Sequence, residues 1–302
     1  MSGAISPEHV ANAARAKALY SADLPPGGLL ADWRFAVRDA RKLIGEALRA
    51  SAFLTDISGA LRKDSGYGVA FRHLMAPPIS QDQFKLLCPQ WSKSSENQRT
   101  AAHPRAAGAA EAAILPRLDP GLVRWTREAG RAPSRQEIRT VLKVAAVLIA
   151  QQKVATARRK RLSFEQEYDV AALLEADGWR RLPSQLIDRR AAVPPKSFMH
   201  KTRFSTKTLA QEVDIACGLE GTFVLAMECK VTNDETNSVK RINDILKKAT
   251  AWHEHWGSFV RTAALLKGVV APKDVQRLTD ADVEVFWSHD LDAFRKWLAP
   301  LA

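Results

Sequence analysis

Two strand-like runs joined by a glycine-containing turn constrain the fold of this chain more than any other stretch. The first run is QEVDIAC (211–217), the second is TFVLAMECKV (222–231), and the turn between them carries Gly218 and Gly221. Glycine adopts the backbone conformations that a tight turn needs, so the second run is expected to fold back against the first. The sequence therefore predicts an antiparallel strand pair within a sheet.

This strand pair carries ionisable side chains among its apolar residues. Because successive side chains of a strand point to opposite faces, Glu228 and Lys230 share one face of the second strand. Asp214 lies between the apolar Val213 and Ile215 of the first strand. When the two strands pair, Asp214, Glu228 and Lys230 are expected to converge.

Such a convergence suits one kind of chemistry. Two carboxylates held close together repel each other, and a divalent cation such as Mg²⁺ between them relieves the repulsion. The ion binds a phosphate oxygen and a water molecule, while a neighbouring lysine orients the water and offsets the charge of the transition state. The three residues therefore point to metal-assisted attack on a phosphodiester. The simpler alternative is an edge-strand Glu–Lys pair, which contributes well under about 1 kcal/mol to stability.

Around the strand pair, helix and strand signals alternate from about residue 158 onward, as in α/β proteins. A helix is expected from Ser163, a capping residue with Gln166 three positions later, to Gly178, where it stops. A proline-bearing loop is expected from residue 189 to 207, with six Lys or Arg residues, one His and no acidic residue. Further strands are expected near 180–187, 261–270 and 283–289, and further helices at 237–256, 272–281 and 291–300.

The chain before this region is expected to be mainly helical. Segments 32–54 and 134–157 have apolar residues at three- and four-residue spacing, whereas the piece between 75 and 108 is broken by prolines and polar residues. The pattern changes at a basic run, ARRKR. The sequence therefore divides into a mainly α-helical part, residues 1–157, and an α/β part, residues 158–302.

Charge favours nucleic acid as the partner. The chain has 45 Lys and Arg against 33 Asp and Glu, a net charge of +12 and a pI near 9.8, which attracts polyanions. A soluble basic protein without a nucleic-acid role is the alternative. No run reaches the length of a membrane span and the N-terminus lacks a signal-peptide pattern, so we expect a cytoplasmic protein without a membrane partner. The three cysteines are too few and too scattered for a zinc cluster or a disulfide framework, and are read as reduced thiols.

The stretches FSTKTLAQEVDIACGLEGTFVLAMECKVTNDETNSVKRINDILKKATAWHEHWG and VEVFWSHDLDAF resemble the PD-(D/E)xK nuclease superfamily, and the XamI-type restriction endonucleases in particular. The resemblance covers most of residues 160–298. The proline that precedes the first motif aspartate in the family is replaced here by Val213, which touches no ligand.

The resemblance implies a fold and an activity. The fold is a restriction-endonuclease-like mixed sheet flanked by helices, preceded by a mainly helical N-terminal domain for DNA recognition and dimerisation. The activity is that of a Mg²⁺-dependent type II endonuclease that cuts both strands of a short palindrome in double-stranded DNA, GTCGAC or a close relative. The family also implies a homodimer and a cognate DNA methyltransferase that acts on the same site without a stable complex.

The resemblance also assigns roles to single residues. Asp214 and Glu228 match the metal-binding acids, Lys230 matches the catalytic lysine, and the backbone carbonyl of Cys229 completes the metal shell. A further helix carboxylate is frequent in the superfamily. Glu167, on the helical face of the apolar residues, is favoured for this role over Glu165.

Eight residues near the predicted site are candidates for contact with DNA. Those of the basic loop have no obvious acidic partner, those after the catalytic lysine are short polar side chains, and those of the next helix are exposed cations. They are Lys201, Arg203, Lys207, Asn233, Asn237, Ser238, Lys240 and Arg241. For the polar ones, capping of the helix at residues 236–238 is the alternative. Lys247 and Lys248 are expected elsewhere on the helix surface.

Two other functions compete with a restriction enzyme. A nuclease of the same fold that acts on DNA structure or damage usually has a shorter chain, whereas about 155 residues precede the predicted nuclease fold here. A non-catalytic DNA-binding protein on a decayed nuclease scaffold fits poorly, because Asp214, Glu228 and Lys230 are all present.

Overall fold

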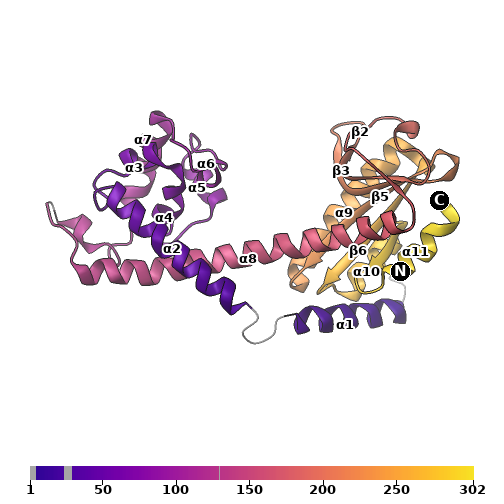
Figure 1. The fold of residues 1–302 in the computed structure, drawn as a ribbon, viewed down its shortest axis with the longest axis horizontal. Coiled ribbons are helices and arrows are strands. Elements are labelled where there is room, and N and C mark those ends of the chain that lie inside the picture. The colour runs from indigo at the N-terminus through magenta and orange to yellow at the C-terminus, as the bar shows by residue number, and fades with distance from the viewer. Residues whose placement is uncertain (1–4, 24–28, 129) are drawn as a thin grey trace. The chain divides into compact units, whose positions relative to one another are not determined.

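The computed structural model describes residues 5–23, 29–128 and 130–302. The chain divides into two compact units (Figure 1). One unit is Pro26–Ala157, and the other combines Met1–Pro25 with Arg158–Ala302. Below, the first is called the helical unit and the second the sheet unit.

The helical unit consists of helices and short connections, which confirms the predicted helical region. Its helices are α2 (Leu30–Ala50), α3 (Ile57–Lys63), α4 (Gly68–Arg72), α5 (Gln81–Leu87), α6 (Ser95–Gln98), α7 (Pro104–Ile114) and the first part of α8 (Arg135–Ala176). In α2, Ala40, Ile44, Ala47 and Leu48 are buried at three- and four-residue spacing. They pack into one core with residues of the later helices, including Phe71.

Helix α8 is longer than the sequence pattern indicated. It runs without interruption from Arg135 to Ala176, so Ser163 is not an N-cap but lies inside the helix. Residues 155–162, ATARRKRL, contain neither glycine nor proline, so nothing in this segment breaks the helix. The predicted stop is correct: Gly178 follows the helix with φ of +77°, a conformation that favours glycine.

By length and composition alone, α8 is also the one described helix that could cross a membrane; its most apolar window has a mean hydropathy of 1.2. Its apolar residues Val141, Ala145 and Ile149 instead pack into the core of the helical unit. The prediction that no segment has the length and composition of a membrane span is therefore wrong for α8.

The sheet unit contains a mixed seven-stranded sheet within the described residues, which confirms the predicted fold class. The strands are β1 (Arg180–Leu182), β2 (Leu186–Ile187), β3 (Ser197–Phe204), β4 (Gln211–Gly218), β5 (Val224–Thr232), β6 (Val260–Gly268) and β7 (Val283–Trp287). Their order is β1-β3-β4-β5-β6-β7, with β2 also paired to β3. The β3–β4 and β4–β5 pairs are antiparallel and the others are parallel. The predicted strand pair is therefore the centre of the sheet.

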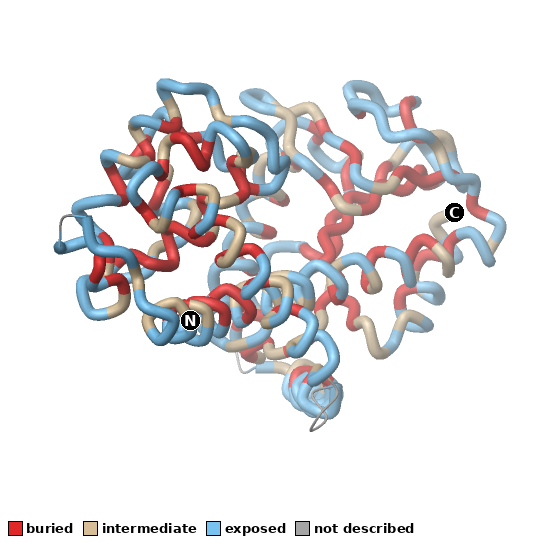
Figure 2. Tube along the Cα trace, turned by 60° about the vertical axis from the view of Figure 1, so that its left-hand side comes forward, coloured by how far each residue is buried: buried red, intermediate tan, exposed pale blue. Residues whose placement is uncertain are grey.

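Helices cover both faces of this sheet. The alternation along β5 shows the two faces: Ala226 belongs to the core under α9 (Glu235–Trp256), whereas Met227 belongs to the core under α8 and α11 (Leu291–Leu298). Helix α10 (Pro272–Thr279) packs on β7. Figure 2 shows buried residues gathered in the interior, with exposed residues on the outer sides of the coiled segments.

Helix α1 (Pro7–Ala22) belongs to this unit and not to the helical unit, although the sequence division at residue 157 placed it there. Its buried Ala13 and Ala16 share a core with Leu266 of β6. A helix face formed by alanines does not indicate, from the sequence, which distant strand it covers.

The predicted basic loop at 189–207 is wrong for residues 197–204, because they form strand β3. Phe198, Met199 and Phe204 are buried, and β3 pairs with strands on both sides. The interspersed cations concealed this strand in the sequence. The segment 180–187 likewise forms two short strands, β1 and β2, with Pro183 between them.

Candidate active site

The two central carboxylates meet where the ladder between β4 and β5 ends. Ile215 pairs with Met227, which places Asp214 opposite Glu228 in the next position. There the backbone N–H of Cys229 donates to Asp214 Oδ2 at 2.9 Å instead of continuing the ladder. The register of the sheet therefore brings together the two acids that the sequence predicted to converge.

Two lysines hold the carboxylate of Glu228, which is fully buried. Lys230 Nζ donates to Glu228 Oε2 and lies 3.5 Å from Asp214 Oδ2. From helix α9, Lys248 Nζ donates to both oxygens of Glu228, at 2.9 and 2.8 Å, and to the backbone carbonyl of Glu212 at 2.9 Å. Lys248 is thus part of the site, and its predicted place on the outer surface is wrong.

The third carboxylate is Glu167 of α8, which is buried. Lys201 Nζ donates to Glu167 Oε1 and to Asp214 Oδ1, both at 2.7 Å. His200 Nε2 lies 2.8 Å from Glu167 Oε2, and the Ser163 hydroxyl donates to Oε1 at 3.3 Å. The alternative helix carboxylate, Glu165, is half exposed and pairs with Arg161.

Burial and charge act in opposite directions on the pKa of each group. Burial raises the pKa of the Asp214 carboxyl, but the charge of Lys230 and the hydrogen bond from Lys201 outweigh burial, and its pKa falls below the usual value. For Glu228 burial prevails, and its pKa is raised despite Lys230 and Lys248. Burial lowers the pKa of Lys230, but the charges of Glu228 and Asp214 outweigh burial, and the pKa lies above its usual value. The lysine therefore stays protonated. Asp214 is therefore the more acidic of the two carboxyls.

The predicted DNA contacts differ in accessibility. Arg203, Lys207, Lys240 and Arg241 are exposed, as are Asn233 and Asn237. Ser238 is fully buried, so a DNA contact from its side chain is excluded. The cap of α9 is Asp234, whose side chain accepts from the N–H of Asn237, and not a residue of 236–238. Lys201 is half exposed but already paired with two carboxylates.

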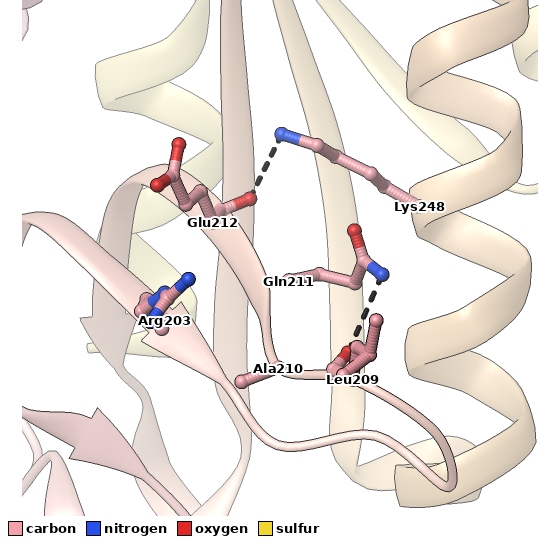
Figure 3. A pocket seen from close by; sticks show the side chains of 6 residues that line it. All are labelled: Arg203, Leu209, Ala210, Gln211, Glu212 and Lys248. Carbon is pink, nitrogen blue, oxygen red and sulfur yellow. Dashed lines mark hydrogen bonds between the residues drawn. The ribbon is translucent and has the colours of Figure 1, made fainter. Parts of the chain in front are cut away.

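A groove of about 540 Å³ opens beside the site (Figure 3). It lies between the turn that joins β3 to β4 and helix α9, and Figure 3 shows Lys248 at one side reaching to the backbone of Glu212. Its lining residues are Arg203, Leu209, Ala210, Gln211, Glu212 and Lys248. Lys248 also contacts Glu228, so its side chain lies between the groove and the buried carboxylate.

Sequence reasoning missed Lys248, His200 and the ion pairs of Lys201. One signal for Lys248 was present: it lies three residues after Ile245 and four before Trp252, both buried, and so lies within the apolar stripe of α9. No comparable signal marked His200 or Lys201, because the strand that carries them was not recognised.

The chemistry of the site fits a hard divalent cation. Asp214 and Glu228 supply carboxylate oxygens and the Cys229 backbone supplies a carbonyl, the donor types that Mg²⁺ prefers. No group of three or more His, Cys, Asp or Glu side chains among the described residues is placed to hold one ion. A metal ion here would therefore depend on two carboxylates together with backbone or solvent oxygens.

Known proteins with similar sequences are restriction enzymes. The model of the XamI restriction endonuclease family matches residues 52–287. The type II restriction enzyme XamI of Xanthomonas campestris pv. amaranthicola is 31% identical over 209 residues, 68% of this chain and 73% of that enzyme. Among solved structures, the protein VC1899 from Vibrio cholerae matches with a TM-score of 0.31 and 10% identity over 88% of this chain and 56% of its own. The chain therefore belongs to the XamI family of type II restriction endonucleases.

Proposed function

We propose that this endonuclease requires Mg²⁺ and cuts both strands of a short palindrome, GTCGAC or a close relative, by attack of a water molecule on the phosphodiester. The observation that carries the proposal is the convergence of Asp214, Glu228 and Lys230. Cys229 N–H fixes Asp214 at 2.9 Å, and the Lys230 ammonium lies between the two carboxylates. This is the arrangement that metal-assisted phosphodiester hydrolysis needs.

The metal ligands in this proposal are Asp214, Glu228 and the backbone carbonyl of Cys229. When bound there, Mg²⁺ would supply charge stabilisation at the phosphate and a more acidic water molecule. The low pKa of Asp214 keeps that carboxylate ionised at neutral pH. The two lysines at Glu228 favour its charged form against the effect of burial.

Lys230 is the proposed catalytic lysine. Its side chain is only 12% exposed and is held by both carboxylates, so the ammonium has a defined position. It orients the attacking water and offsets the negative charge that grows on the phosphate as the new P–O bond forms and the bond to the leaving sugar oxygen breaks. Glu167 is the proposed additional carboxylate, which acts through Lys201 and His200.

Double-stranded DNA is the proposed partner, and the net charge of +12 supports it. The exposed candidates for phosphate contact are Arg203, Lys207, Lys240 and Arg241, with Lys201 once its ion pairs open. Asn233 and Asn237 are the candidates for contact with base edges. Each of these side chains lies on a strand or helix that also carries a residue of the site, or in the turn directly after such a strand.

A homodimer is the proposed assembly, because a palindrome has two-fold symmetry and one chain contains one set of Asp214, Glu228 and Lys230. The helical residues before 158 are the proposed region of recognition and dimerisation. The protein is proposed to act in the cytoplasm, where a cognate DNA methyltransferase modifies the same site without forming a stable complex with it.

The test is cleavage of phage and plasmid DNA that contain or lack GTCGAC. We expect discrete fragments with Mg²⁺, no cleavage with excess EDTA, and no cleavage by Asp214→Asn, whose side chain keeps the volume but loses the charge. A smear of fragments would favour a nuclease that acts on structure or damage. Full activity in EDTA would remove the metal mechanism.

A further inference from the structure

Six charged groups of the site form one connected cluster of ion pairs. Three carboxylates, from Glu167, Asp214 and Glu228, are paired with three ammonium groups. The ammonium groups belong to Lys201, Lys230 and Lys248. The formal charges of these six groups cancel, so a cation that enters the cluster has to compete with an ammonium group already present.

The three lysines differ in how firmly they are held. The side chains of Lys230 and Lys248 are only 12% and 16% exposed, and both contact the fully buried Glu228. Lys201 is 54% exposed and reaches the cluster from the surface. Of the three ammonium groups, that of Lys201 therefore leaves with the least rearrangement of buried groups.

The backbone at Lys201 supports the same conclusion. Lys201 has φ of +52°, a left-handed conformation that is unfavourable for lysine and rare inside a strand. His200 pairs with Ile215 and Thr202 pairs with Val213, but Lys201 and Asp214, which lie opposite each other between them, are not paired. The ladder is thus open at the residue whose side chain lies between Glu167 and Asp214.

We propose that Lys201 is an internal counter-ion that bridges Glu167 and the metal-binding carboxylate of Asp214 until a divalent metal ion binds Asp214 and displaces the ammonium group. This inference rests on the proposed metal dependence. Its ammonium lies 2.7 Å from each carboxylate, and a doubly charged ion would interact more strongly with Asp214 than one ammonium group does. Lys201 is therefore a positioning residue that neutralises Asp214 in the absence of the metal ion and lowers the metal affinity of the site.

Calorimetric titration with Mn²⁺ at constant pH tests this inference without DNA. Lys201→Met removes the competing ammonium, and we expect it to bind Mn²⁺ at least about tenfold more tightly than the wild-type protein. The matched control is Lys207→Met, which removes the same charge from the neighbouring turn, where Lys207 makes no ion pair among the described residues. Because an exposed charge is screened, the control should change the affinity less than about twofold.

Equal or weaker binding by Lys201→Met than by Lys207→Met overturns the inference and makes Lys201 a support for the metal site. If neither the wild-type protein nor Lys201→Met binds Mn²⁺ more tightly than Asp214→Asn does, the proposed metal dependence is overturned as well. Circular dichroism establishes whether the variants are folded.

A measurement on the wild-type protein tests the displacement without any amino-acid substitution. Acetylation of single lysines by acetic anhydride is followed by mass spectrometry with and without Mn²⁺. Displacement predicts that the acetylation rate of Lys201 rises when Mn²⁺ is added while that of Lys207 stays the same. An unchanged or slower rate at Lys201 under conditions in which Mn²⁺ binds refutes the displacement.

Discussion

Replacement of Lys248 by methionine removes an ammonium group from the buried side of the active site while keeping most of the side-chain volume. All three of its donors are used: two hydrogen bonds go to the oxygens of Glu228 and one goes to the carbonyl of Glu212. Glu228 is fully buried and retains only Lys230 as a charged partner in the variant. The substitution should therefore destabilise the sheet unit.

The magnitude follows from these contacts. Removal of one partner of a buried ion pair costs about 3–5 kcal/mol, because the other charge stays buried without compensation. Lys230 still contacts Glu228, so we expect a loss at the lower end, about 3 kcal/mol of unfolding free energy at pH 8. An exposed lysine of the same helix, Lys247, serves as the control, and its replacement should change stability by less than about 0.5 kcal/mol.

The loss should depend on pH in a defined direction. Burial already raises the pKa of Glu228 above its usual value of 4.5, and loss of Lys248 should raise it further. A carboxyl whose pKa is higher in the folded than in the unfolded protein favours folding when it is protonated. The stability deficit of the variant is therefore largest above the folded pKa and shrinks as the pH falls toward 4.5.

Urea unfolding followed by circular dichroism at pH 5 and pH 8 measures both effects. Combination with Glu228→Gln in a double-mutant cycle should give a coupling energy of about 2 kcal/mol at pH 8, because the two side chains are in contact. A Lys248→Met protein that is as stable as Lys247→Met, or a coupling energy near zero, would refute the assignment of Lys248 to Glu228.

Three further predictions concern other parts of the molecule. Lys230→Ala should lower the cleavage rate about 10³-fold with little change in DNA affinity in a gel-shift assay, because it acts on the transition state and is one of many positive charges; an equal loss of binding would make it a phosphate anchor. Burial lowers the pKa of His73 from 6.5 to about 4, so the stability that His73 contributes above pH 6.5, about 3 kcal/mol, is lost as the pH falls toward 4. His73→Gln should remove this pH dependence of the unfolding free energy, measured by urea unfolding between pH 6.5 and pH 4. Gly218→Ala should destabilise by about 3 kcal/mol in thermal unfolding, because its Cβ would lie 2.1 Å from the Pro194 carbonyl oxygen, whereas Gly108→Ala, which meets nothing within 4 Å in α7, should be neutral or stabilising.

The sequence by itself determined the features that depend on nearby residues. The turn at Gly218 and Gly221 and the alternation in 222–231 predicted the β4–β5 pair and the shared face of Glu228 and Lys230, because strand periodicity is a local property. The apolar spacing of 237–256 predicted α9 for the same reason, to within two residues of its start. The acids and the lysine of the motif could thus be named before any tertiary contact was known.

The tertiary structure alone decided which distant groups complete the cluster. Lys201 meets Glu167 across 34 residues of sequence, and Lys248 meets Glu228 across 20. No local pattern encodes these contacts, because they depend on strand order, on the register of β3 against β4 and on the packing of α8 and α9 on opposite faces of the sheet. The same holds for the continuity of α8 and for the place of α1, since a helix of alanines packs on whichever strand the rest of the fold offers. The local chemistry was set by the sequence, and the balance of three ammonium groups against three carboxylates arises only when the sheet and its helices are assembled.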